Sequence, residues 1–166
     1  IWLLWILWTT LELGFSGLSL TLFTQHTPPP GTDGGLLNAI VGSLIMVTIA
    51  TAIGAPVGVL AGIYLAEYGQ KNLLAETTRF INEILLSAPS IVIGLFIYAI
   101  YVARVGEFSA IAGIISLALI VIPVVVSTTE NMLKLVPNSQ REAAFALGAP
   151  RHAVILQVTL RASLAG

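Results

Sequence analysis

Residues 34–66 read GGLLNAIVGSLIMVTIATAIGAPVGVLAGIYLA and contain no Asp, Glu, Lys, Arg or His. A helix that crosses a bilayer needs about 20 apolar residues, so this stretch is long enough for one complete span. We expect further spans over about 1–23 (with a semi-polar exit), 84–103 and 108–129, and the start of a fifth near His152. The sequence therefore predicts an all-α, polytopic transmembrane helical bundle.

The composition excludes a soluble domain. The chain is 57% hydrophobic and 9% charged, whereas soluble domains carry about 25% charged residues. Its net charge of −1 and lack of a dense basic cluster argue against a nucleic-acid partner. The chain has no Cys, and His26 and His152 each lack a second ligand nearby, so we expect no metal site. Because the chain starts and stops at apolar runs, we expect a fragment.

The loops between the expected spans differ in charge. The segments 67–79 and 130–161 together hold six basic residues, whereas the opposite loops hold only Arg104. Cytoplasmic loops carry an excess of Lys and Arg. The segment 130–161 is therefore predicted to be cytoplasmic, and the proline-rich loop around 28–31 is predicted to face outward.

Small residues and prolines interrupt the expected spans. The second span carries a stripe of glycines at four-residue intervals, namely Gly54, Gly58 and Gly62. Such spacing lets two helices touch backbone to backbone, so we expect this face to pack against another helix. Each of the second, third and fourth spans also has an interior proline: Pro56, Pro89 and Pro123. Broken helices are tolerated in membranes where they are buried in protein or line a cavity, which favours a transport core.

The segment 139–150, which reads SQREAAFALGAP, predicts a short capped helix. Ser139 suits an N-cap, and Glu142 lies three residues later, at the spacing of a capping box. Gly148 suits the left-handed residue that ends a helix, and Pro150 then prevents its continuation. A helix of about eight residues is roughly 12 Å long, too short to cross a bilayer but suited to docking against a partner.

This segment resembles the cytoplasmic signature of the membrane subunits of ABC importers, Glu-Ala-Ala-x-x-x-Gly. In that family the loop docks into a cleft of the ATP-hydrolysing subunit. The resemblance implies a docking surface made of Glu142, Ala143, Ala144, Leu147 and Gly148. The family usually continues with Ile-x-Leu-Pro; Val158 and Leu160 fit this pattern, but Arg161 replaces the proline.

Longer stretches resemble one branch of that family, the A-type permease subunit of the bacterial phosphate-specific ABC importer. They are FTQHTPPPG at 23–31, YLAEYG at 64–69, RFINEILLSAPSIVIGLF at 79–96 and TTENMLKLVPNSQREAA at 128–144. The resemblance implies a type-1 permease fold with six spans, of which this fragment holds four to five. It also implies a first span and periplasmic loop over 1–37, and a truncated type-1 domain over 38–166 with the docking loop at 130–151.

The resemblance further implies a multi-pass protein of the bacterial inner membrane that moves phosphate inward. Its expected partners are a second permease subunit, two ATPase subunits and a periplasmic phosphate-binding protein. The sequence has no Gly-x-x-x-x-Gly-Lys-Ser/Thr phosphate loop. We therefore expect the chain not to be an enzyme and to bind no cofactor, with ATP and Mg used by the separate ATPase.

One position departs from the family pattern. The family commonly has Arg where this chain has Ser127. A phosphate in low-dielectric surroundings needs a compensating charge or many hydrogen-bond donors, and a serine supplies one donor and no charge. The hydroxyls beside the interior prolines are candidate pathway groups: Ser87, Ser90, Ser127, Thr128 and Thr129.

Three other functions are open at this point. Residues 14–17 fit the Gly-x-Ser-Gly pattern of intramembrane serine proteases, but Ser16 needs a base within hydrogen-bond reach. His26 lies in the proline-rich loop and His152 on the opposite side of the membrane, so neither lies in a span facing Ser16. A secondary transporter needs charged residues deep in its spans, and the centres of spans two to four are uncharged. An ABC importer permease for another substrate fits the docking loop equally well.

Overall fold

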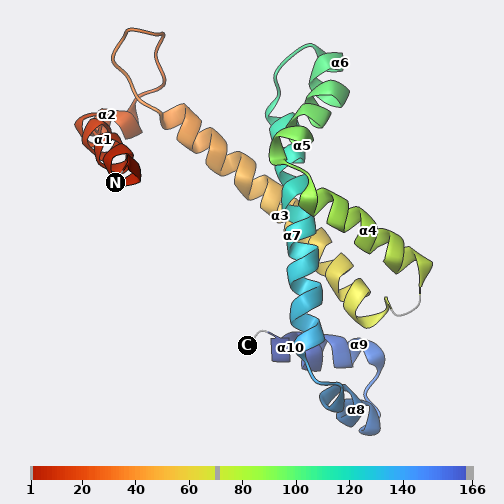
Figure 1. Ribbon diagram of the computed structural model, residues 1–166. Coiled ribbons are helices and arrows are strands. Elements are labelled where there is room, and N and C mark those ends of the chain that lie inside the picture. Colours follow the sequence, from red (N-terminus) through yellow and green to blue (C-terminus); the bar gives the residue numbers. More distant parts are fainter. Residues whose placement is uncertain (1, 70–71, 164–166) are drawn as a thin grey trace. The chain divides into compact units, whose positions relative to one another are not determined.

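The structure, a computed structural model, describes residues 2–69 and 72–163 (Figure 1). Within these two ranges every regular element is a helix, as the sequence predicts. The chain separates into two compact units, residues 1–45 and 46–166, which are described separately. The predicted division between residues 37 and 38 stays a prediction.

The first unit holds α1 (Trp2–Ser16), α2 (Leu20–Thr24) and the beginning of α3 (Leu37–Glu67). The expectation of one span over 1–23 is wrong, because the helix is not continuous over these residues. The helix is interrupted by a turn in which the Gly17 N–H donates to the Gly14 carbonyl at 3.2 Å. The described part of α1 has 15 residues, fewer than the roughly 20 that a complete crossing requires.

Among the described residues, two helices are long and apolar enough to cross a membrane, α3 with 31 residues and α7 (Ala110–Leu135) with 26. They correspond to the expected second and fourth spans. The fourth span was expected to end near residue 129, but α7 continues to Leu135. The first six residues of the predicted docking loop 130–151 are therefore helical and belong to α7.

The third expected span, 84–103, is not a single kinked helix. The structure has α4 (Leu73–Ser87), then α5 (Ser90–Ile97), the π-helix η1 (Tyr98–Val102) and α6 (Ala103–Val105), with a bend of 103° between the two halves. Pro89 disfavours a helical conformation at Ala88, whose ψ is 128°. Arg79, which was expected in a loop, lies within α4 because that helix begins at Leu73 under an Asn72 cap.

The glycine stripe of α3 lies against α7. A Cβ atom built on Gly58 would be 2.7 Å from Cβ of Val125, and one on Gly62 would be 2.6 Å from Cβ of Thr129. At Gly54 the nearest atom would be Cγ1 of Val121, at 3.2 Å. The contacts advance by four residues on both helices, so α3 and α7 run parallel in close contact.

The chain ends in a group of short helices after α7. They are α8 (Asn138–Ala146), α9 (Arg151–Ala153), the π-helix η2 (Val154–Thr159) and α10 (Leu160–Ser163). Figure 1 shows this group in blue beside the C-terminal end of α7. Residues 164–166 lie outside the described ranges, so the fifth span stays a prediction.

Candidate functional site

The candidate docking helix is α8, and its N-terminus differs from the prediction. The helix begins at Asn138, and Pro137 is the N-cap residue, with no side-chain cap hydrogen bond. The predicted capping box of Ser139 and Glu142 is therefore wrong, because Ser139 already lies inside the first turn. Proline has a fixed φ near −65° and no N–H to satisfy, so the helix can start directly after Pro137.

The C-terminus of α8 forms as predicted. Gly148 has a φ of +78°, which is the left-handed conformation that glycine adopts without steric cost. The Ala149 N–H donates to the Ala144 carbonyl at 3.2 Å, and the Gly148 N–H donates to the Phe145 carbonyl at 2.9 Å. These two bonds make a Schellman motif, which ends α8 sharply before Pro150.

The five predicted docking residues share this short segment, and most of them are exposed. No residue of α8 is buried, and Leu147, just after the helix, is 89% exposed. Glu142, Ala143 and Gly148 are exposed, whereas Ala144 is half-buried. The segment therefore exposes a charged side chain, small residues and two large apolar side chains, Phe145 and Leu147.

The inner side of α8 is fixed by Arg141. Its Nη2 lies 2.9 Å from Oε1 of Glu67, the last residue of α3, and its Nε lies 3.2 Å from the same oxygen. The same guanidinium donates to the carbonyls of Leu133 at 2.8 Å and Val136 at 2.6 Å, at the end of α7. The last carbonyls of a helix have no partner within it, so Arg141 satisfies them while it holds three helices together.

A second arginine, Arg151 in the segment that follows α8, contacts the same end of α3. Arg151 donates from Nη2 to the Glu67 carbonyl at 2.6 Å, and its guanidinium lies 4.3 Å above the ring of Tyr68. That ring is stacked on the ring of Tyr64 at 6.3 Å. Both arginines therefore contact Glu67: Arg141 binds the carboxylate of Glu67, and Arg151 binds its backbone carbonyl.

Polar side chains also join α4 to α7. Arg79 donates from Nε to Oε1 of Glu130 at 2.8 Å, and Nζ of Lys134 lies 2.7 Å from that same oxygen. One turn away, Nδ2 of Asn82 donates to Oγ of Ser127 at 2.8 Å. The contacts step by three residues along two antiparallel helices and fix their register.

Comparison with known proteins assigns the family. Residues 58–166 match the family model described as binding-protein-dependent transport system inner membrane component. The chain belongs to this family. The match includes the glycine face of α3 from Gly58 onward, all of α4 to α7, and α8. The apolar helices make this member of the family a multi-pass membrane protein.

Several relatives of this chain bear the name phosphate transport system permease protein PstA. The protein from Yersinia pestis is 61% identical over 99% of this chain, which covers 56% of that relative. The protein from Pasteurella multocida is 59% identical over 99% of this chain and 59% of the relative. The permease chain thus spans rather more than half the length of these relatives.

A solved structure supports the fold. The structure described as inward facing conformations of the MetNI methionine ABC transporter matches with a TM-score of 0.59 and 28% sequence identity. The match covers 78% of this permease chain and 61% of the other chain. The predicted ABC permease fold is therefore confirmed, and membership of a transport family replaces the serine-protease alternative. The side chain of Ser16, on which that alternative depended, lies outside the described part of the structure.

The structure does not gather the five candidate pathway hydroxyls into one site. Those of Ser87 and Thr128 donate to carbonyls of their own helices, Ile84 at 2.9 Å and Val124 at 2.8 Å. Ser90 begins α5, and Thr129 packs against the glycine stripe of α3. Among these five residues, a described hydrogen bond joins the hydroxyl to a different helix at Ser127 alone: Oγ of Ser127 accepts from Nδ2 of Asn82 in α4.

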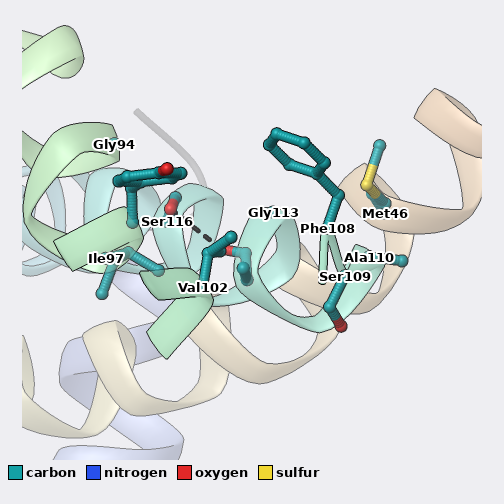
Figure 2. A pocket seen from close by; sticks show the side chains of 11 residues that line it. Met46, Gly94, Ile97, Val102, Phe108, Ser109, Ala110, Gly113 and Ser116 are labelled. Carbon is teal, nitrogen blue, oxygen red and sulfur yellow. Dashed lines mark hydrogen bonds between the residues drawn. The ribbon is translucent and has the colours of Figure 1, made fainter. Parts of the chain in front are cut away.

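A separate hollow of about 490 Å³ lies beside η1, in the permease's second unit (Figure 2). Its lining is mainly apolar, and Figure 2 shows Phe108 and Met46 together on one side of it. Phe108 is 92% exposed. The polar side chains of the lining are Tyr98, Ser109 and Ser116, so none of the candidate pathway residues contributes to it.

The ion pairs that join α8 to α3 and α4 to α7 were not predicted from the sequence. Glu67, Arg79, Glu130 and Arg141 were counted only as loop charges, if at all. A usable signal was present, because acidic residues at the ends of apolar runs, Glu67 and Glu130, accompany basic residues in the segments that follow. Charges at the end of a span are costly to leave unpaired, and this pattern indicates ion pairs between helices.

Proposed function

We propose that the full-length protein is the permease subunit of an ATP-driven phosphate importer and forms part of the translocation pathway of a bacterial inner membrane. The observation that carries this proposal is the 61% identity across 99% of the chain with a phosphate transport system permease protein. The all-helical fold, with α3 and α7 in close contact, supplies the transmembrane scaffold that such a function requires.

In this proposal ATP and Mg are used by a separate subunit, which docks on α8. The excess of basic residues at this end of the spans supports a cytoplasmic position for α8. The exposed segment from Glu142 to Gly148 supports docking. A Schellman motif fixes its C-terminal end, and the side chain of Leu147 is exposed to solvent. The other partners are a second permease subunit, a second ATPase copy and a periplasmic phosphate-binding protein.

A permease for another substrate is the second candidate. The structural similarity to a methionine transporter, with a TM-score of 0.59, shows that the same fold serves other cargo. The test is uptake of labelled phosphate by cells that lack their own importer and express the full-length protein with its partner subunits. Uptake above the empty-vector control supports the phosphate assignment, whereas normal assembly without uptake contradicts it.

The docking proposal predicts a specific crosslink. Ala144→Cys places a thiol on the half-buried face of α8, and a second cysteine is introduced in the cleft of the ATPase subunit. We expect a disulfide-linked product in the full assembly, because the small-residue face allows close approach. Phe108→Cys, in the loop before α7 at the opposite end of that helix, is the control and should give none. The absence of a crosslink at every position along α8 would contradict docking.

The phosphate pathway is tested at Ser127. The substitution Ser127→Arg restores the charge that the family commonly has, and a charge-assisted hydrogen bond is stronger than a neutral one. We expect the phosphate concentration for half-maximal uptake to fall about tenfold, which corresponds to about 1.4 kcal/mol. Ser127→Gln is the control, because it lengthens the side chain without charge and also removes the hydroxyl that accepts from Asn82. Equal values for Ser127→Arg and the unmodified protein would remove Ser127 from the pathway.

A further inference from the structure

The docking helix α8 has two sides with different contacts. Glu142 and Leu147 are exposed, whereas the neighbouring Arg141 points toward the spans, and its side chain is 15% exposed. Because no residue of α8 is buried, apolar burial holds this helix only weakly. Its described links to α3 and α7 are therefore chiefly the polar contacts of Arg141.

These contacts converge from two helices on one guanidinium. Arg141 binds the Glu67 carboxylate at 2.9 Å and the carbonyls of Leu133 and Val136 at 2.8 and 2.6 Å. The Glu67 side chain is 9% exposed, so the pair is largely withdrawn from solvent. Arg presents a rigid planar fork of donors, and a fork held by three acceptors resists both rotation and translation.

We infer that Arg141 is a positioning residue that, through Glu67, carries the movement of α8 directly into α3 and α7. This inference rests on the proposed docking of α8 to an ATPase. The Schellman end and the guanidinium contacts make α8 a rigid arm, fixed to the C-terminal ends of two parallel spans that are themselves packed backbone to backbone. A displacement of α8 by the ATPase moves both spans as one body.

Arg151 strengthens the same anchor from beyond the helix. It donates to the Glu67 carbonyl at 2.6 Å and stacks on Tyr68 at 4.3 Å. The segment that contains α8 is therefore attached to the end of α3 on both sides. These two attachments hold α8 at the end of the spans although none of its residues is buried, so α8 transmits force to them.

The test uses the full-length permease with its partner subunits in proteoliposomes. The quantity measured is inorganic phosphate transported per ATP hydrolysed, together with the Ala144 crosslink as a readout of docking. For Arg141→Gln and Glu67→Gln we expect this ratio to fall on the order of tenfold, with the crosslink retained. The double variant should be no worse than either single one, because both remove the same pair. Arg161→Gln, at an exposed arginine of α10, is the charge-matched control.

An unchanged ratio with the crosslink retained, or additive losses in the double variant, would overturn the inference. If Arg141→Gln does not assemble, Arg141→Lys keeps the charge but not the fork, and we expect it to assemble with a reduced ratio. Normal coupling in Arg141→Lys, or failure of both variants to assemble, would show that Arg141 acts only in folding and would also overturn the inference.

A distance measurement separates this inference from the phosphate assignment. Spin labels at Gln140 in α8 and Leu60 in α3, both exposed, should report the same distance with and without ATP. In Arg141→Gln we expect this distance to change when ATP binds. A change in the unmodified protein would overturn the rigid attachment. An assembly that keeps the distance fixed but moves no phosphate would contradict the proposed substrate alone.

Discussion

Gly58→Leu is expected to lower the assembly yield of the permease strongly. A Cβ at this position would lie 2.7 Å from Cβ of Val125 and 3.1 Å from the Ile122 carbonyl oxygen. Contact with backbone cannot be relieved by a rotamer change, so α3 and α7 must separate. Overpacking of this kind typically costs about 1–3 kcal/mol and occasionally more. Assembly yield after detergent extraction, measured by size-exclusion chromatography, checks the result.

Gly94→Leu is the matched control for this prediction. Gly94 lies in α5, and a Cβ built on it meets no atom within 4 Å. We expect this variant to assemble in normal yield, because its leucine enters the hollow beside η1 rather than a helix contact. Normal assembly and transport in Gly58→Leu would contradict the close packing of α3 against α7.

Gly148→Val is expected to uncouple ATP hydrolysis from transport. The φ of Gly148 is +78°, and a side chain in the left-handed region costs roughly 1–2 kcal/mol, with a larger penalty for a β-branched residue. The Schellman bonds from Gly148 and Ala149 then open, and the end of α8 loses its fixed position. We expect phosphate transported per ATP hydrolysed to fall about tenfold, the change that 1.4 kcal/mol produces.

Gly106→Val separates backbone strain from loss of docking. Gly106 has a φ of +80°, and neither glycine has an atom within 4 Å of a built Cβ. The two substitutions therefore impose the same backbone strain. Gly106 lies before α7, however, whereas Gly148 lies at the C-terminal end of α8. We expect Gly106→Val to lower stability without changing the coupling ratio. Gly148→Asn should be milder, because Asn tolerates the left-handed region. Equal coupling ratios for the two valine variants would contradict a specific role of Gly148.

The parts of this fold that the sequence predicts are those determined locally. Hydropathy located α3 and α7 because each is one long apolar run, and the four-residue glycine spacing indicated which face of α3 packs. Gly148 was predictable because a left-handed residue has a strong chemical preference. The start of α8 was misplaced by two residues, because Ser139 and Pro137 are both compatible with a helix N-terminus.

Contacts between residues distant in the chain were not predictable from one sequence. Arg79 and Glu130 are 51 residues apart, and Arg141 and Glu67 are 74 residues apart. Pro89 indicated a kink, but the bend of 103° also depends on α4 being held against α7 by Arg79 and Asn82. The candidate pathway residues were chosen from the sequence because they carry hydroxyl groups. Whether such a hydroxyl bonds to its own helix depends on the side-chain rotamer, which residue spacing does not determine.

Three of the six basic residues that favour one orientation of the spans lie in ion pairs within the described part of the chain. Glu130 pairs with two of them and Glu67 with a third, while a fourth rests on an aromatic ring: Arg79, Lys134, Arg141 and Arg151. Orientation during insertion responds to Lys and Arg and hardly to acidic residues. The topology signal is therefore read while the chain is still unpaired, and folding afterwards compensates part of the positive charge that set it.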